Sequence, residues 1–158
     1  MNQKLILKYT ASIATSLLTA FVGWVAISTS YNPWFTELEK SAFHPAEWLA
    51  IAVWIILFFM MGIAAGKAWN KGFYHKWVQV ALYHFGFQLI LTGFWFLAFF
   101  GLQQPLLAFL VVLALLVLLF LTIKWFKIVD DTAAYLMYPT VIWVLYMALL
   151  NFELWRLN

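Results

Sequence analysis

Five long apolar runs constrain what this chain can fold into more than any other feature of its sequence. They cover roughly residues 5–28, 48–69, 77–100, 106–126 and 133–155. Each is close to the ~20 residues that an α-helix needs to cross the hydrocarbon of a bilayer. With 66% hydrophobic and 9% charged residues, a water-soluble domain could not bury this apolar surface, whereas lipid solvates it. We therefore predict an all-α membrane protein, a bundle of five transmembrane helices that forms one domain over residues 1–158.

Only the first of the four connections between these runs, residues 29–47, is long enough to have a structure of its own. The stretch YNPWFTELEKSAFHPAEW, which runs from this connection to Trp48, holds three of the six carboxylates, two of the four prolines and two tryptophans. The other connections are short enough to be simple turns between antiparallel neighbours. A polar loop at one end of an apolar bundle is where we first look for function, although Glu37 and Glu39 also suit a merely solvated surface.

The basic residues are divided unevenly between the two ends of the predicted bundle. Seven lysines fall on the side of the amino terminus, against Lys40 and Arg156 on the other side. The seven are Lys4, Lys8, Lys67, Lys71, Lys76, Lys124 and Lys127. Because cytoplasmic loops carry the Lys/Arg excess, we predict an integral multi-pass protein of a bacterial cell membrane with a cytoplasmic amino terminus; an outer-membrane location stays open. The net charge of +3 then reflects topology, so the expected partner is the lipid bilayer and not nucleic acid.

Small residues mark the helix faces that can pack closely, because lipid offers no hydrophobic drive for helix association. The first run has a stripe of Ser, Thr and Gly, and the second has Gly62 and Gly66. These two stripes favour packing within one chain. Gly86 and Gly93 of the third run suit either packing within the chain or a homodimer, and we expect a homodimer through such a face.

Polar and aromatic side chains at membrane depth are the candidates for a binding site. Gln88, Thr92 and Trp95 share one face of the third run, and Trp143 and Tyr146 lie near each other on the fifth. Any one of them is explained by a hydrogen bond between helices. Buried indole N–H groups, including that of Trp54, need a partner or a ligand, so several such residues converging would indicate a pocket for a large flat aromatic molecule.

Metal and haem sites are not predicted. His44 belongs to one end of the bundle, while His75 and His84 lie near the other, so no pair of helices offers two histidines to a haem. The carboxylates of the first loop lack a histidine cluster and are expected in water. We therefore expect no metal and no cofactor other than a bound ligand.

Ordered motifs from Trp34 to the end of the chain resemble one known family. They are the loop WFTELEKSAFHPAEW, the second-run residues Trp48, Trp54, Phe58, Met61 and Gly62, the third-run stretch QLILTGFWFLAFFGL leading to Pro105, and AAYLMYPTVIWVLYMALLN in the fifth run. Together they resemble the TspO/MBR family, the tryptophan-rich sensory proteins and translocator proteins, formerly called the peripheral benzodiazepine receptor. No single motif among them would be specific.

The resemblance implies a five-helix bundle, commonly dimeric, with a ligand pocket beneath a lid formed by the loop of residues 29–47. It implies binding of porphyrins such as protoporphyrin IX, and of isoquinoline and benzodiazepine-type drugs. By matching position, the implied pocket residues are Trp34, Phe35, Trp54, Phe58, Thr92, Trp95, Trp143 and Met147. Gln88 and Tyr146, from the polar faces above, complete the expected ligand-binding set.

Departures from the family pattern bear on this expectation. Thr92 stands where the family usually has Asn, and Met147 replaces an Ala, so a narrower pocket is expected. Ala46 and Ala52 replace prolines, which is expected to loosen the lid and straighten the second span. Phe152 stands in place of the tyrosine of the weak carboxyl-terminal cholesterol pattern, so we do not expect sterol binding.

Three functions follow as hypotheses. The favoured one is a membrane receptor or carrier for porphyrin-like tetrapyrroles. The first alternative is a slow, light-dependent porphyrin-degrading enzyme, which some bacterial family members resemble, with Trp54 and Trp143 as candidate catalytic residues. The second alternative is a ligand-free regulatory or interaction protein whose aromatic residues only pack.

Overall fold

The described chain is almost entirely helical. The computed structural model describes residues 3–158, apart from the side chains of residues 30–32. Its long helices are α1 Gln3–Ser30, α2 Glu47–Asn70, α3 Lys76–Phe96, α4 Pro105–Val129 and α6 Tyr138–Leu157. Its short ones are α5 Asp131–Tyr135 and the π-helical turns η1 Tyr31–Phe35 and η2 Leu97–Gly101.

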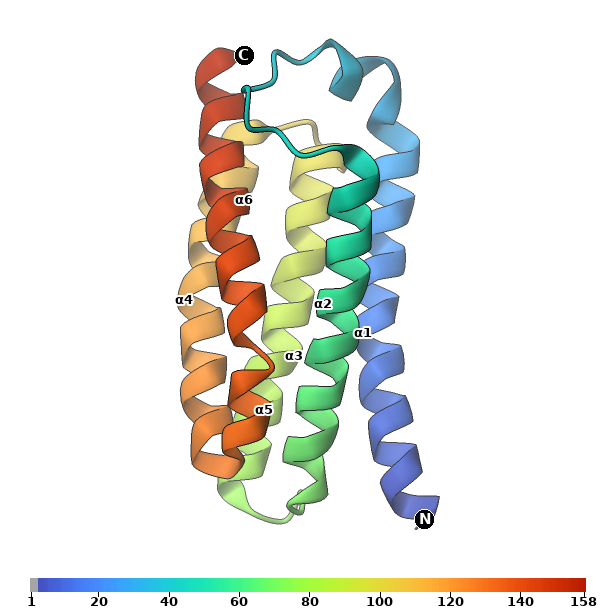
Figure 1. Cartoon of the computed structure of the whole chain (residues 1–158), viewed down its shortest axis with the longest axis vertical. Helices are drawn as coiled ribbons and strands as arrows, with labels where there is room; N and C mark the ends of the chain where they lie inside the picture. The colour runs from blue at the N-terminus through green and yellow to red at the C-terminus, as the bar shows by residue number, and fades with distance from the viewer. Residues whose placement is uncertain (1–2) are drawn as a thin grey trace.

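Five stretches of the described chain are long and apolar enough to cross a membrane. They are Gln3–Thr29, Glu47–Asn70, Lys76–Gly101, Pro105–Val129 and Asp131–Leu157. The predicted all-α fold with five spans is therefore confirmed. Because the number of spans is odd, the amino and carboxyl termini lie at opposite ends of the bundle (Figure 1).

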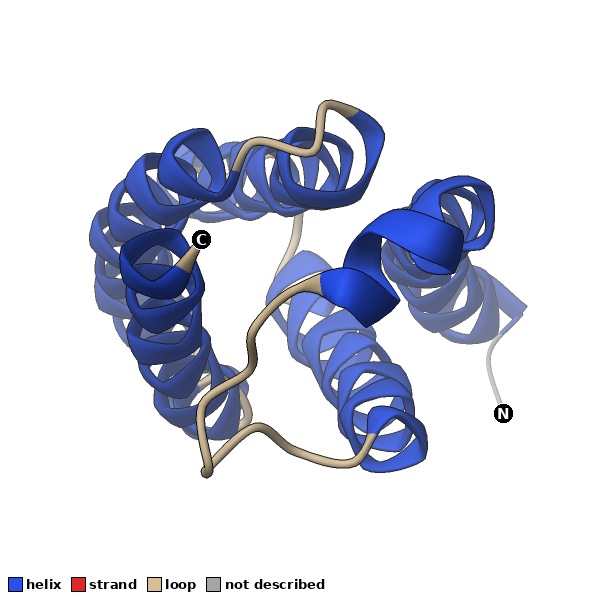
Figure 2. Ribbon diagram, turned by 90° about the horizontal axis from the view of Figure 1, so that it is seen from above, coloured by secondary structure: helices blue, strands red, loops and turns tan. Residues whose placement is uncertain are grey.

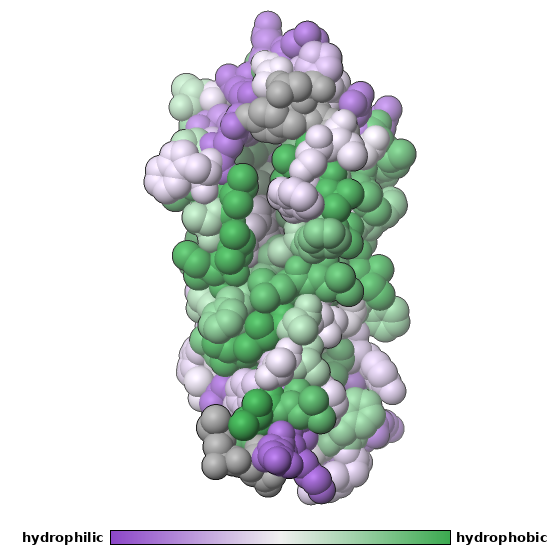
Figure 3. Space-filling model, turned by 90° about the vertical axis from the view of Figure 1, so that its right-hand side faces the viewer, coloured by the Kyte–Doolittle hydropathy of each residue, from purple (hydrophilic) through white to green (hydrophobic). Residues whose placement is uncertain are grey.

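The helices form a closed ring in which each span contacts its neighbours. α1 packs on α2 and α3, α4 packs on α3 and α6, and a smaller contact between α2 and α6 completes the ring (Figure 2). On the face drawn in Figure 3, hydrophobic side chains cover the middle of the molecule and hydrophilic ones gather toward its two ends. Side chains such as Leu7, Trp24 and Ile142, which are 68%, 61% and 69% exposed, therefore suit contact with lipid.

Glycines bring α1 and α2 together over the half of the bundle that contains the amino terminus. A Cβ atom at Gly62 would lie 2.5 Å from the Cα of Ile13, and one at Gly66 would lie 2.8 Å from the Tyr9 ring. The expected packing of these stripes within one chain is thus observed. A Cβ at Gly93 would lie 3.8 Å from the Thr19 methyl group, whereas one at Gly86 would meet nothing within 4 Å. Gly93 therefore faces this chain's own α1, and the expected dimer contact stays a prediction that now rests on Gly86.

Two local differences from the expected elements have clear physical causes. The loop expected over residues 29–47 is helical up to Glu37, because Phe35 is buried and Trp34 packs on Phe99 with ring centroids 5.4 Å apart. The fifth span is interrupted between α5 and α6, just before Pro139. Proline has no N–H to donate to the preceding turn and its ring disfavours an unbroken helix there.

The start of the fifth span is fixed by an extended residue, Asp130, that caps α5. Its side chain accepts a hydrogen bond from the Ala133 N–H at 2.9 Å and pairs with Lys71 Nζ at 3.1 Å. Burial acts to raise the pKa of Asp130, but the hydrogen bonds from Ala133 and Lys71 and the charges of Lys67 and Lys71 outweigh it and lower the pKa. This contact joins the α2–α3 and α4–α5 connections at the lysine-rich end.

Candidate functional site

The segment that connects η1 to α2 crosses the end of the bundle, as Figures 1 and 2 show. We call residues 36–46 the lid. On its inner side, Phe35 at its root packs on Phe100 and on the lid residue His44, with ring centroids 5.4 and 5.9 Å apart. The ammonium group of Lys40 lies 4.4 Å from the centre of the Phe35 ring, which is within the range of a cation–π contact. The lid is therefore held by aromatic packing at its first end.

A cavity of about 90 Å³ lies directly beneath the lid. Its walls come from α1, η1, the lid, α2, the α3–η2 segment and α6. The lining residues are Ile27, Phe35, His44, Pro45, Ala50, Ile51, Trp54, Trp95, Phe96, Phe99, Phe100, Met147, Leu150, Asn151 and Leu154. The surface is largely apolar, with His44 and Asn151 as the polar side chains that interrupt it, as is typical of small-molecule pockets.

Trp54 stands at the centre of the aromatic wall. Its ring centroid lies 5.4 Å from that of Phe58, 5.8 Å from that of Trp95 and 5.4 Å from that of Phe96. Trp143 approaches it edge-on at 6.5 Å. These separations lie in the range where aromatic pairs stabilise a structure beyond simple burial, by about 0.5–1.5 kcal/mol each. The wall is therefore a cluster of rings in mutual contact.

A hydrogen-bonded pair between α3 and α6 forms the polar part of the cavity wall. The buried Trp95 indole N–H donates to Asn151 Oδ1 at 3.3 Å, and Asn151 Nδ2 donates to the Met147 carbonyl at 2.7 Å. A buried indole N–H needs a hydrogen-bond partner, and that of Trp95 finds one in Asn151 of the same chain. Asn151 was not in the expected ligand-binding set, although its spacing of four residues from Met147 places both on one face of the fifth span.

Three polar groups below the cavity have unused hydrogen-bonding capacity. Trp143 Nε1 and Gln88 Oε1 are buried without a hydrogen-bond partner, as is Thr140 Oγ1. Gln88 Nε2 donates to Met61 Sδ at 3.1 Å, and Thr92 Oγ1 donates to the Gln88 carbonyl at 2.8 Å within its own helix. An unpaired buried polar group costs free energy, so Gln88 and Trp143 are the groups that a ligand reaching deeper would satisfy.

The structure brings together part of the expected ligand-binding set. Phe35, Trp54, Trp95 and Met147 line the cavity beneath the lid. Phe58 lies behind Trp54 and lines a second cavity, of about 260 Å³, between α1 and α2. Gln88, Thr92 and Trp143 do not line the cavity beneath the lid, and neither does Tyr146, whose hydroxyl donates to the lid carbonyl of Phe43 at 2.5 Å.

Trp34 turns to the opposite side of the lid root. It borders an open polar groove of about 770 Å³ together with Glu37, Gln103 and Trp155. A helical segment can present only one of two adjacent residues to a given face, so Phe35 takes the inner side and Trp34 the outer one.

Other lining residues were not foreseen from the sequence. Phe96, Phe99 and Phe100 share a face through their spacing of three and four residues, which was a usable signal. His44 and Pro45 carried no such signal, because the path of an irregular loop is not periodic. Among residues 3–158, no group of three or more His, Cys, Asp or Glu residues is placed to hold a metal ion.

His44 is the titratable group of the cavity wall. Burial lowers its pKa from the ordinary 6.5, the charge of Lys40 lowers it further, and Glu47 opposes this. Its Nδ1 is buried without a hydrogen-bond partner. The neutral imidazole is therefore the form that suits the closed lid.

These features define a class: a small membrane protein of five helices with an aromatic pocket beneath the loop that joins its first two spans. The sequence profile of the TspO/MBR family matches residues 12–156, and the chain belongs to that family. The resemblance inferred from the motifs is therefore confirmed.

Relatives of known name cover nearly the whole chain. The tryptophan-rich protein TspO of Archaeoglobus fulgidus is 35% identical over 153 residues, 97% of this chain and 98% of the relative. That of Chlorobaculum tepidum is 34% identical over 158 residues, 100% of this chain and 99% of the relative. The human translocator protein is 33% identical over 146 residues, 89% of this chain and 84% of the relative.

Proposed function

We propose that this protein is a membrane receptor or carrier that binds porphyrin-like tetrapyrroles in the pocket beneath the lid. The observation that carries the proposal is the convergence of Phe35, Trp54 and Trp95, from separate elements, on one largely apolar cavity. A flat conjugated ring stacks on such a wall. Two relatives are named translocator protein and tryptophan-rich sensory protein, names that refer to transport and to sensing. Both activities begin with the binding of a molecule.

The pocket must widen to admit such a ligand. Its volume of about 90 Å³ is well below the ~300 Å³ at the lower end of pockets for drug-sized molecules. Two parts of the wall suit this movement. The lid is an irregular segment, and the flexible thioether chain of Met147 occupies space that an Ala would leave free. The unpaired polar groups of Gln88 and Trp143 lie on the helices of the lining residues Trp95 and Met147, two turns and one turn away from them.

Titration with protoporphyrin IX in the dark tests the proposal. Detergent-purified protein is expected to show saturable quenching of tryptophan fluorescence at micromolar ligand. Met147→Ala is expected to bind several-fold more tightly, because it removes bulk from the wall. Trp143→Phe is expected to bind about five-fold more weakly, because it removes the unpaired indole N–H that a ligand reaching deeper would bond, and one hydrogen bond contributes about 1 kcal/mol.

The matched control is Trp77→Phe, which removes an indole that stacks on Trp125, with centroids 5.7 Å apart, at the opposite end of the bundle. Its affinity should equal that of the wild type. Quenching that never saturates, or affinities that are the same in all four proteins, would refute the placement of a porphyrin in this pocket.

A second candidate function is light-dependent degradation of the bound porphyrin, with dioxygen as the oxidant. It is favoured by the cluster of three indoles, since Trp95 and Trp143 lie 5.8 and 6.5 Å from Trp54. Such a cluster suits electron donation to a photo-excited ring. Loss of porphyrin absorbance under illumination in air, suppressed in Trp54→Phe and absent in the dark, would support it; a stable spectrum under illumination would exclude it.

A further inference from the structure

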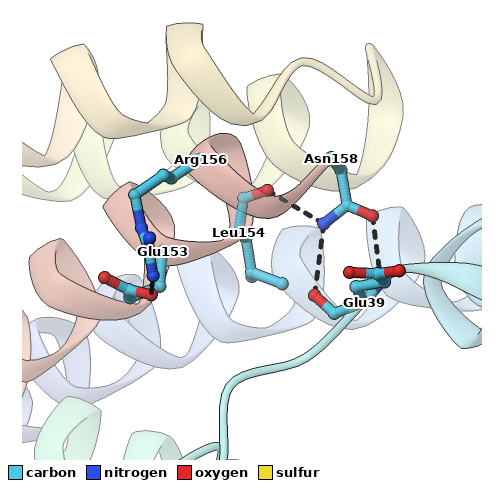
Figure 4. A network of polar contacts seen from close by, with 5 residues as sticks. All are labelled: Glu39, Glu153, Leu154, Arg156 and Asn158. Atoms are coloured by element: carbon cyan, nitrogen blue, oxygen red, sulfur yellow. Dashed lines mark hydrogen bonds and ion pairs between the residues drawn. The ribbon is translucent and has the colours of Figure 1, made fainter.

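The lid is attached to α6 by hydrogen bonds from a single asparagine near the end of that helix (Figure 4). Asn158 Oδ1 accepts from the Glu39 N–H at 2.9 Å, and Asn158 Nδ2 donates to the Glu39 carbonyl at 3.1 Å. The same Nδ2 donates to the Leu154 carbonyl at 2.9 Å. One side chain therefore satisfies both backbone groups of a lid residue, as a paired strand would, and is itself oriented by the last turn of α6.

A second attachment holds the lid farther along its course. The Tyr146 hydroxyl donates to the Phe43 carbonyl at 2.5 Å. Phe43 is next to His44, whose ring lines the cavity beneath the lid. The hydrogen bond of Tyr146 therefore fixes the part of the lid that covers the pocket. The lid's other hydrogen bonds are local. The His44 N–H donates to the Ser41 carbonyl at 3.0 Å, and the Ala46 carbonyl accepts from the first turn of α2, so none of these bonds ties the lid to α6.

Neither residue lines the cavity beneath the lid. Their hydrogen bonds to the lid are exposed, so water competes and each bond adds only a modest stabilisation. Attachments of this kind are strong enough to keep a lid closed most of the time, yet weak enough to open without unfolding the bundle.

We propose that Asn158 and Tyr146 are positioning residues that latch the lid over the pocket, and that a ligand gains access when these hydrogen bonds break. The proposal rests on the proposed function for its ligand, but the latch itself can be measured without one. Because access requires opening, the association rate constant is limited by the fraction of molecules with an open lid. Weakening the latch raises that fraction and leaves the aromatic wall intact.

The kinetic test uses stopped-flow quenching of the full-length protein by protoporphyrin IX. Asn158→Ala and Tyr146→Phe are each expected to raise the association rate constant roughly three- to tenfold, in line with the loss of exposed hydrogen bonds. The double variant is expected to exceed either single one. Tyr146→Phe removes one oxygen atom and no ring, so aromatic packing stays.

The matched control is Arg156→Ala. It breaks the contact from Arg156 Nη2 to Glu153 Oε2 at 2.6 Å, which is also drawn in Figure 4 and lies on the same turn of α6 without touching the lid. Its association rate constant should equal that of the wild type. Rate constants within twofold of the wild type in both latch variants, or an equal rise in Arg156→Ala, would overturn the proposal.

Hydrogen exchange of the backbone amides, measured without ligand, separates failure of the latch from failure of the proposed function. The Glu39 N–H and its neighbours in the lid are expected to exchange several-fold faster in Asn158→Ala and no faster in Arg156→Ala. Unchanged exchange in Asn158→Ala would overturn the latch whatever binds. Faster exchange in a protein that never binds protoporphyrin would keep the latch and refute the proposed ligand.

Discussion

At the scale of single residues, the neighbours of a side chain decide its role more than its type does. Trp54, Trp95 and Trp143 are all tryptophans more than a turn inside their spans. The indole N–H of Trp95 is satisfied by Asn151, whereas that of Trp143 is buried without a partner. Only the second is free to bond a ligand, so Trp143 has a potential polar role that Trp95 lacks.

The clearest prediction at this scale concerns His44. Its pKa is lowered in the closed lid, first by burial and then by Lys40, so the closed form binds fewer protons than an open, solvated form. The closed lid is therefore most favoured above the ordinary pKa of 6.5 and loses stability as pH falls from there through the lowered pKa. With one proton involved, the ratio of open to closed lid is expected to rise by at most about tenfold per pH unit.

An environment-sensitive fluorophore on Ala42→Cys, a single thiol in a chain without cysteine, would report this opening between pH 8 and pH 5. His44→Gln should flatten the response, and His84→Gln should leave it intact, because His84 lies outside the lid with its Nδ1 2.8 Å from the Val80 carbonyl. A response that survives His44→Gln would assign the titration to another group.

At the scale of secondary-structure elements, α1 and α2 show how helices associate in lipid, where the hydrophobic effect does not hold them together: their backbones come into close contact. The absence of a side chain at Gly62 lets the two helices approach so closely that a Cβ would sit 2.5 Å from the Ile13 backbone. Backbone atoms cannot rotate away as a side chain can. The dispersion attraction between such closely packed helices then holds the pair together.

Gly62→Ala is therefore expected to destabilise the protein, although Ala favours helix more than Gly does. Overpacking against backbone costs about 1–3 kcal/mol, and the α1–α2 pair should separate. Gly93→Ala is the control, because its Cβ would lie 3.8 Å from Thr19, an ordinary contact. Unfolding followed by tryptophan fluorescence in mixed micelles should show a lower midpoint for Gly62→Ala only; equal midpoints would disprove a tight backbone contact at Gly62.

At the scale of the whole molecule, the ring of five spans leaves open space beside a glycine of α3, Gly86. Gly86 borders a groove of about 280 Å³ with Ala11, Thr15 and Tyr83, and a Cβ there would meet nothing within 4 Å. The amino terminus lies at the lysine-rich end and the lid at the other (Figure 1). The cytoplasmic orientation of the amino terminus stays a prediction from the positive-inside rule.

The homodimer expected from the sequence is best placed at Gly86. Gly86→Leu should shift the protein from dimer toward monomer, because a bulky side chain prevents close approach of a second backbone. Gly93→Ala should have no effect, since Gly93 contacts its own chain. The measurement is the molar mass of the protein by light scattering in a mild detergent. A dimer in both variants would show that the dimer contact does not involve Gly86, and a monomeric wild type would refute the homodimer.

The sequence by itself determined the class of this protein. Five apolar runs of bilayer length, separated by polar or proline-containing segments, permit little besides a helical bundle, because unpaired backbone groups are not tolerated in lipid. Motif order was enough to indicate the family. By matching position the resemblance also implied eight pocket residues, and four of these, Phe35, Trp54, Trp95 and Met147, line one cavity.

Only the tertiary structure decided which aromatic residues form the wall, how large the cavity is and what holds the lid. Helical spacing defines a face, but the rotation of each helix against its neighbours depends on packing far away in the chain, so Trp34 and Gln88 could not be separated from the lining residues. The lid contacts join residues 103 and 119 positions apart. No local pattern encodes such pairs, because they exist only after the helices have assembled.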